Sequence, residues 1–185
     1  MARIKGTGML GVVKTLRADK EKARQLLPVH LHFYLTERII ASGWYPAEDF
    51  LEVLRTAAKM LPIKKEEYYE MVGRSSANQD LNGVYHEFRR DGDPLGMLKA
   101  GVLAWRSYHD TGKILVTPEG ENSARVDLAG YMMACEEMCA IHTAWIDEDL
   151  RLAGARDIEV AHTRCCCRDD QLCRWEVRWT PLGKR

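Results

Sequence analysis

The chain has 185 residues, a length that fits one domain with a sizeable core. Its 27 lysine and arginine residues balance 27 aspartate and glutamate residues, so we expect no basic surface for nucleic acid or for a membrane. No apolar run approaches the ~20 residues of a membrane-spanning helix, and the first residues lack the apolar core of a signal peptide. We therefore expect a cytoplasmic protein.

The first part of the chain, residues 1–111, has mainly helical periodicity. Apolar residues recur every three or four positions, Gly43 and Pro62 interrupt the pattern, and Pro46 suits the first position of a helix. The stretch 75–80 is polar and is expected to be a connection. Helices are therefore predicted over 17–41, 46–61, 65–73 and 95–109.

From residue 112 onward, the pattern changes to short alternating segments around one long helix. The predicted order is two strands, a helix and two more strands, over 113–117, 124–128, 131–152, 157–163 and 172–179. The whole chain, 1–185, is thus predicted to be a single α+β domain. Its N-terminal helices precede a ββαββ unit (112–180), whose antiparallel sheet carries the long helix on one face.

The cysteines are confined to a short stretch near the C-terminus, and the first 134 residues have none. Cytoplasmic thiols stay reduced, so this clustering indicates metal binding or thiol redox chemistry rather than a disulfide framework. The cysteines are Cys135, Cys139, Cys165, Cys166, Cys167 and Cys173.

Side-chain direction brings four metal-binding residues toward one point. On the last two strands, His162 and Cys173 share a face with apolar neighbours and should point toward the core. Cys139 lies on the apolar stripe of the long helix, and Cys165 begins the turn between the strands. Three thiols and one imidazole complete a closed tetrahedral set, which is typical of structural zinc.

Other interpretations of the cysteines stay open. Cys135 has the character of a small buried hydrophobic residue. Cys167 could replace Cys165 as the third thiolate, and spare thiols could be redox-active if their pKa values were depressed. A lone inward-facing histidine is also common as a hydrogen-bonded core residue, so the prediction depends on the combination with the thiols.

The spacing of the four residues resembles the metal site of 4-vinyl reductase-type small-molecule-binding domains, which also serve as sensors in phenol- and toluene-responsive transcription activators. Those sites have a cysteine on the long helix, and Cys139 matches it. His162 stands where they have a carboxylate. Cys165 follows it by three residues and Cys173 by eight more. The resemblance covers roughly residues 113–179 and implies a zinc-containing ligand-binding domain.

The N-terminal half resembles bacterial proteins that are distantly similar to haem nitric-oxide-binding (H-NOX) domains. H-NOX domains, 4-vinyl reductase-type domains and Golgi transport-tethering subunits are grouped as one fold superfamily. The resemblance implies an α/β ligand-binding fold with a pocket between helices and sheet, and a tendency to form homodimers. The segments that carry it are 5–7, 43–46 and 69–74.

The same resemblance raises the question of haem. Haem-binding members clamp the propionates with a Tyr-x-Ser-x-Arg stretch, and the nearest segment here, 122–125, lacks the tyrosine. His86 and His109 are the candidates for a proximal ligand. His109 lies in an expected turn and His86 on an expected solvated face, so the sequence disfavours haem.

A pocket for a small apolar or aromatic ligand is implied beside the zinc site. Its expected wall residues are Tyr85, His86, Trp105 and Tyr108. We expect a sensor or regulatory domain with structural zinc, acting through a separate output protein because the chain carries no recognisable DNA-binding or ATPase segment. A dimeric scaffold without ligand, a reductase-type enzyme and a haem-based gas sensor are the alternatives. The absence of a cofactor motif favours a binding protein over an enzyme.

Overall fold

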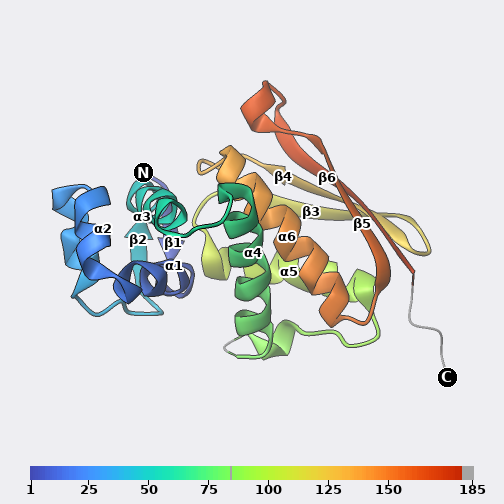
Figure 1. The fold of residues 1–185 in the computed structure, drawn as a ribbon. Coiled ribbons are helices and arrows are strands. Elements are labelled where there is room, and N and C mark those ends of the chain that lie inside the picture. The colour runs from blue at the N-terminus through green and yellow to red at the C-terminus, as the bar shows by residue number, and fades with distance from the viewer. Residues whose placement is uncertain (84, 181–185) are drawn as a thin grey trace. The chain divides into compact units, whose positions relative to one another are not determined.

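The computed structural model describes residues 1–83 and 85–180, in which helices precede an antiparallel four-stranded sheet (Figure 1). This is the predicted α+β class. The chain forms two compact units. One consists of Met1–Tyr68 with Ser107–Asp110, and the other of Tyr69–Arg106 with the residues from Thr111 onward. Among the described residues, no helix is both long and apolar enough to cross a membrane.

The first unit is a helical layer with one small two-stranded sheet. Its longest helices, α1 and α3, pack against each other, and β1 pairs antiparallel with β2. Met9 and Leu16 of α1 and Leu54 of α3 have no exposed surface. The elements are β1 (Arg3–Lys5), α1 (Gly6–Ala18), α2 (Lys20–Leu26), η1 (Val29–Leu35), β2 (Trp44–Pro46) and α3 (Ala47–Met60).

The predicted helix over 17–41 is wrong. The structure has α1, α2 and the 3-10 helix η1 in its place, with breaks at Asp19 and at Leu27–Pro28. Pro28 cannot donate a helical hydrogen bond and disfavours helical backbone at the residue before it, which explains the second break. Helix α1 was not predicted, because Gly6, Gly8 and Gly11 lower helix propensity over its first half.

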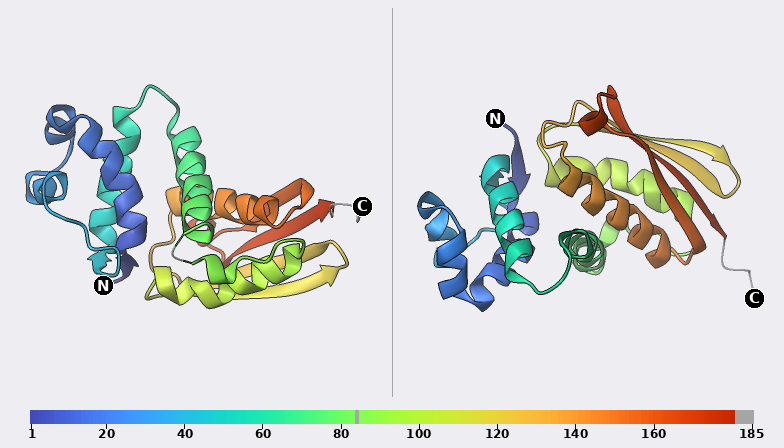
Figure 2. Two further views of the ribbon diagram at one scale, coloured as in Figure 1. Left: turned by 90° about the horizontal axis from the view of Figure 1, so that it is seen from below. Right: turned by 45° about the horizontal axis from the view of Figure 1, so that its top comes forward.

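The remaining elements are α4 (Lys65–Leu81), η2 (His86–Phe88), α5 (Pro94–Tyr108), β3 (Lys113–Gly120), β4 (Ser123–Ala129), α6 (Glu136–Leu152), β5 (Arg156–Arg164), η3 (Cys166–Arg168) and β6 (Leu172–Thr180). The sheet order is β3-β4-β6-β5, with every neighbouring pair antiparallel. The predicted ββαββ unit is therefore confirmed. Figure 2 shows α5 and α6 lying against the same face of this sheet.

Alternation along the strands separates a core face from a solvent face. Leu128 of β4 pairs with Cys173 of β6, and the next core-facing pair along these strands is Val126 with Trp175. All four side chains are buried. The opposite face is polar, so the sheet is covered by helices on one side only. This is the side on which the predicted zinc ligands should meet.

The two largest boundary differences in this part are at the end of α4 and at the start of α6. The polar stretch 75–80 is helical, because its side chains bind α6: Asn78 Nδ2 donates to Glu148 Oε1 over 2.6 Å, and Arg74 forms ion pairs with Asp147 and Glu148. Helix α6 begins at Glu136 rather than at residue 131. Cys135 is consequently the N-cap residue in extended conformation, and it does not continue the helical stripe.

Gly73 allows α4 to approach α6 closely. A Cβ atom at this position would collide with the Ile141 carbonyl oxygen and lie 2.9 Å from Ala144 Cβ. Neither contact is with the flexible end of a side chain, so relief requires the two helices to separate.

We expect Gly73→Ala to lower the free energy of unfolding by about 1–3 kcal/mol, because overpacking outweighs the gain in helix propensity. Gly11→Ala is the matched control, since Gly11 is also helical and a Cβ there meets nothing within 4 Å. The control should be neutral or stabilise by up to about 1 kcal/mol. Urea unfolding measures both, and equal effects would contradict the close helix contact.

Candidate metal centre

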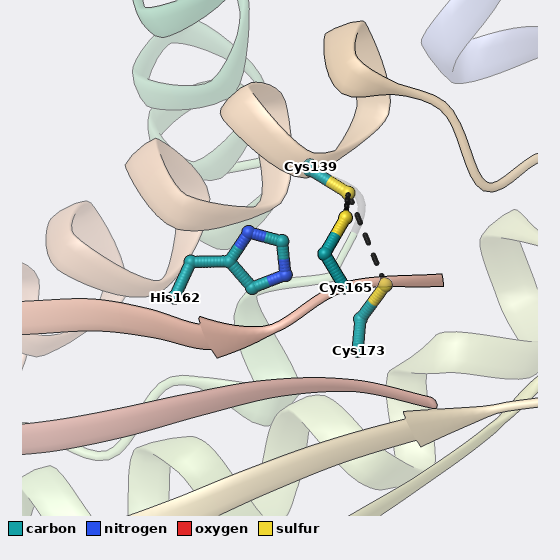
Figure 3. A group of neighbouring side chains, drawn as sticks. All are labelled: Cys139, His162, Cys165 and Cys173. Atoms are coloured by element: carbon teal, nitrogen blue, oxygen red, sulfur yellow. Dashed lines mark hydrogen bonds between the residues drawn. The ribbon is translucent and has the colours of Figure 1, made fainter. Parts of the chain in front are cut away.

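The four predicted ligands meet in the structure (Figure 3). Cys139 comes from α6, His162 from β5, Cys165 from the start of the following turn and Cys173 from β6. Their ligand atoms all lie within 4.8 Å of one another. A helix and a β-hairpin thus supply one group of donors from residues that are far apart in the sequence.

The separation of the sulfur atoms matches a tetrahedral metal site. Cys139 Sγ lies 3.7 Å from Cys165 Sγ and 3.9 Å from Cys173 Sγ. With a zinc–sulfur bond of about 2.3 Å, two sulfurs at the corners of a tetrahedron are about 3.8 Å apart. The two sulfur pairs that involve Cys139 are therefore spaced as one central ion requires, and the three thiols are closed from solvent, with exposures of 2–7%.

His162 completes the group from the side of β5. Its ring stacks on Trp175 with a centroid distance of 4.6 Å, and Figure 3 shows it turned toward the cysteines. Nε2 is buried and has no hydrogen-bond partner among the residues that the structure describes. A buried ring nitrogen without a partner is costly, and binding a metal ion would satisfy it.

The turn after β5 is built around two of the sulfurs. The Cys167 amide donates to Cys165 Sγ over 3.3 Å, and the Cys166 amide donates to Cys173 Sγ over 3.4 Å. Asp170 Oδ2 accepts from the Cys165 amide at 2.7 Å and holds the turn closed. Amide donors directed at sulfur favour the thiolate form, which is the form that binds metal.

The protonation states suit a divalent cation. Burial, followed by the nearby thiols of Cys173 and Cys165, raises the pKa of Cys139, and burial raises the pKa of Cys173 to about 11. Burial also opposes ionisation of Cys165, but its hydrogen bonds, first that from the Cys167 amide, lower its pKa. Burial and then the charge of Arg168 lower the pKa of His162, so its imidazole is neutral. The protein alone does not ionise all three thiols, and a cation would supply the missing charge.

The structure places the other cysteines outside the group. Cys167 is exposed and Cys166 is partly buried, both in η3, whereas Cys165 lies among the clustered donors. Cys135 is partly buried at the N-cap of α6. Of the two alternatives for the third thiolate, position therefore favours Cys165 over Cys167.

Of the predicted pocket residues, Trp105 is connected to the metal-binding group through His142, whose ring faces Trp175, the residue on which His162 stacks. Trp105 is buried, and its ring lies 5.2 Å from that of Tyr131 and 5.4 Å from that of His142. Tyr85 packs near Phe88, with ring centroids 6.2 Å apart. His86 is exposed and its Nδ1 lies 3.1 Å from the Gly83 carbonyl oxygen, while Tyr108 belongs to the first unit. The ligand pocket stays a prediction.

His142 and Thr143 carry no sequence signal beyond their place on the apolar stripe of the long helix. The His142 ring also faces Trp175, at 6.2 Å, and burial followed by the charge of His162 lowers its pKa to about 3. Thr143 Oγ1 accepts from Trp175 Nε1 at 2.8 Å and donates to the Cys139 carbonyl at 2.8 Å. Both residues are one helical turn from Cys139, and the packing of α6 on β6 gives each of them a contact with Trp175.

The structure places the three residues considered for haem in different surroundings. His86 is exposed, and Arg125, the candidate propionate ligand, is paired with Glu119 at 3.0 Å and with Asp127 at 3.3 Å. His109 is buried and lies in the first unit. The expectation that haem is disfavoured stays a prediction.

Comparison with known proteins identifies the fold. No protein-family model and no curated protein sequence matches the chain. Solved H-NOX structures do match. The unliganded Fe(II) protein from K. algicida has a TM-score of 0.69 and 10% identity, over 98% of this chain and 99% of that chain. The Fe(II)NO protein from S. oneidensis has a TM-score of 0.66 and 12% identity, over 95% of this chain and 99% of that chain. An oxygen-binding H-NOX domain related to soluble guanylate cyclases is also similar, with a TM-score of 0.66 and 12% identity over 98% of each chain. The expected H-NOX-like fold is confirmed.

The hydrogen bond from Trp175 of β6 to Thr143 of α6 can be tested by substitution of Thr143. We expect Thr143→Val to lower the free energy of unfolding by about 1–3 kcal/mol, because the buried Trp175 Nε1–H loses its acceptor. Thr180→Val, at an exposed position of β6, should stay within about 0.5 kcal/mol of the wild type. If chemical unfolding gives the same loss of unfolding free energy for both variants, the hydrogen bond between Trp175 and Thr143 does not contribute to stability.

Proposed function

We propose that the chain is a small-molecule sensor domain in which Cys139, His162, Cys165 and Cys173 hold a structural zinc ion. One observation carries the metal assignment: three buried thiols and the half-buried His162 have their ligand atoms within 4.8 Å of one another, and Cys139 Sγ lies 3.7 and 3.9 Å from the other two sulfurs. Neutral imidazole and thiolates suit zinc, and four protein ligands close the coordination sphere. Zinc would supply a cross-link that holds the last hairpin to α6.

The sensor assignment rests on the fold. The similar structures are named for ferrous iron, nitric oxide and oxygen complexes of H-NOX proteins, and they share 10–14% identity with this chain over nearly its whole length. We infer that this chain also responds to a small ligand, of apolar or aromatic character, bound near Trp105. A homodimer in the cytoplasm, acting through a separate output protein, completes the proposal. The centre's closed ligand set supports binding rather than catalysis.

A haem-based gas sensor is the second candidate. The names of the similar structures favour it, since one of them concerns haem distortion in H-NOX proteins. In this chain, the buried His109 is the remaining candidate for an axial ligand. The pairing of Arg125 with carboxylates weighs against it.

We expect one zinc ion per chain in native mass spectrometry of protein prepared with zinc and without chelator. Cys165→Ser and Cys173→Ser should each lose the metal, because a closed site depends on every ligand. Cys135→Ser is the matched control and should keep it, since Cys135 lies outside the donor group. Wild-type protein without metal would contradict the proposal.

The structural role has its own readout. Removing zinc should strip hydrogen-exchange protection from β5 and β6 and lower the unfolding temperature, because metal-binding energy at such a site is folding energy. Unchanged protection in the metal-free protein would show that the ion is not structural.

Addition of haem to the purified protein separates the two candidate ligands. A sensor for an apolar ligand should give only the broad absorption of free haem. A haem sensor should give a sharp Soret band that His109→Ala abolishes, with His86→Ala as the matched control because His86 is exposed. The arrangement of Arg125 and His86 leads us to expect the first outcome.

A further inference from the structure

Asp149 is a buried carboxyl group to which the described part of the chain offers no hydrogen-bond donor. It lies on α6 and is 1% exposed, and neither of its oxygens has a partner among the described residues. Arg74 and Arg151 pair instead with the two preceding residues of α6. A buried carboxyl group without a donor lowers stability, and such a group is expected where a ligand supplies the missing donor.

The interface between α5 and α6 brings this carboxyl group next to an aromatic ring. A Cβ atom at Gly101 of α5 would lie 3.4 Å from two ring atoms of Trp145 and 3.9 Å from Asp149 Oδ2. These are ordinary van der Waals contacts, so a methyl-sized group beside Gly101 can touch both side chains. An aromatic ring and a carboxylate together are typical partners of an ammonium ion.

The positions one helical turn to either side of Gly101 are filled by protein side chains. Toward the end of α5, the Trp105 ring lies 5.4 Å from that of His142, at the place proposed above for the ligand. Toward its start, Met97 belongs to a buried apolar cluster with Ala153, the C-cap residue of α6. Residues four apart on a helix are about 5–6 Å apart, so one ligand of modest size can reach from Trp105 to the carboxyl group.

The charge around Asp149 indicates the chemistry of that ligand. Burial, followed by the negative charges of Asp80 and Glu148, raises the pKa of Asp149 and favours its neutral form while no cation is bound. The same negative charges favour a cation at this point, and a cation in contact with Asp149 favours its carboxylate. A ligand without an N–H or O–H group would leave both oxygens unpaired.

We propose that the small ligand of this domain is an amine, bound as its ammonium ion, with the charged nitrogen between Asp149 and Trp145 beside Gly101 and the apolar part toward Trp105. The inference rests on the proposed sensor function and names the chemical class of its ligand. On binding, the ammonium N–H groups donate to the oxygens of Asp149, and the proton of the carboxyl group passes to solvent.

Calorimetric titration with phenethylamine and with phenethyl alcohol tests the ligand class, because the two probes differ only in the amine and hydroxyl groups. We expect the wild type to bind the amine about tenfold more tightly, since a hydrogen bond between charged groups is the stronger one. Asp149→Asn should lose this preference and bind the alcohol as the wild type does. Glu136→Gln, the matched control, changes an exposed carboxylate of the same helix and should keep the preference.

Gly101→Ala tests the position of the ammonium group in a protein that folds. Its methyl group would occupy that position, so amine binding should weaken at least about tenfold. The unfolding temperature should stay the same or rise, because the new Cβ meets only ordinary contacts and alanine has the higher helix propensity.

Equal binding of the two probes by the wild type, or an unchanged preference in Asp149→Asn, would overturn the amine assignment and leave a sensor for an apolar ligand standing. Binding of neither probe would overturn the assignment as well, and it would also count against the proposed sensor function.

Discussion

The packing of α6 across β5 and β6 is the constraint on which the rest of this unit depends. It brings Cys139 to within 3.9 Å of both cysteine sulfurs from the hairpin, and it places Thr143 between Trp175 and the helix backbone. Helix and hairpin are otherwise separate local structures. Their contact combines buried apolar side chains, the two hydrogen bonds of Thr143 and the group of metal donors in the same small region.

The other side of α6 shows why its position is well defined. Gly73 lets α4 approach the backbone of α6, and Arg74 and Asn78 bind the acidic side chains of Asp147 and Glu148. A shift of α6 would disrupt both the close packing and the polar pairs with α4. Helix α6 is therefore held by α4 on one side and by β5 and β6 on the other. A fixed helix is what a preformed donor group requires, because ligands placed at tetrahedral spacing need little rearrangement to bind an ion.

The position of the cluster also distinguishes the protein's candidate chemistry from that of the structures it resembles. Those proteins are named for ferrous iron and its gas complexes. In this chain, four donors gather between α6 and the β5–β6 hairpin, whereas among the residues considered for haem His86 is exposed, Arg125 is paired with carboxylates and His109 is buried in the first unit. The same fold thus carries a thiol-rich group whose members come from α6, β5, the turn that follows it and β6.

The sequence by itself determined the α+β class, the ββαββ order and the identity of the four clustered donors. Those features depend on local periodicity and on alternation along strands, which place His162 and Cys173 on the core face without reference to distant residues. It failed for residues 6–18, where glycines lower helix propensity, for 17–41, where Pro28 breaks the helix, and for 75–80, where polar side chains obscured the pattern. Only the tertiary structure decided that Asn78 lies in a helix, that Cys165 rather than Cys167 stands among the donors, and that Thr143 joins Trp175 to α6. Each of these depends on contacts between residues distant in sequence, which no local pattern encodes.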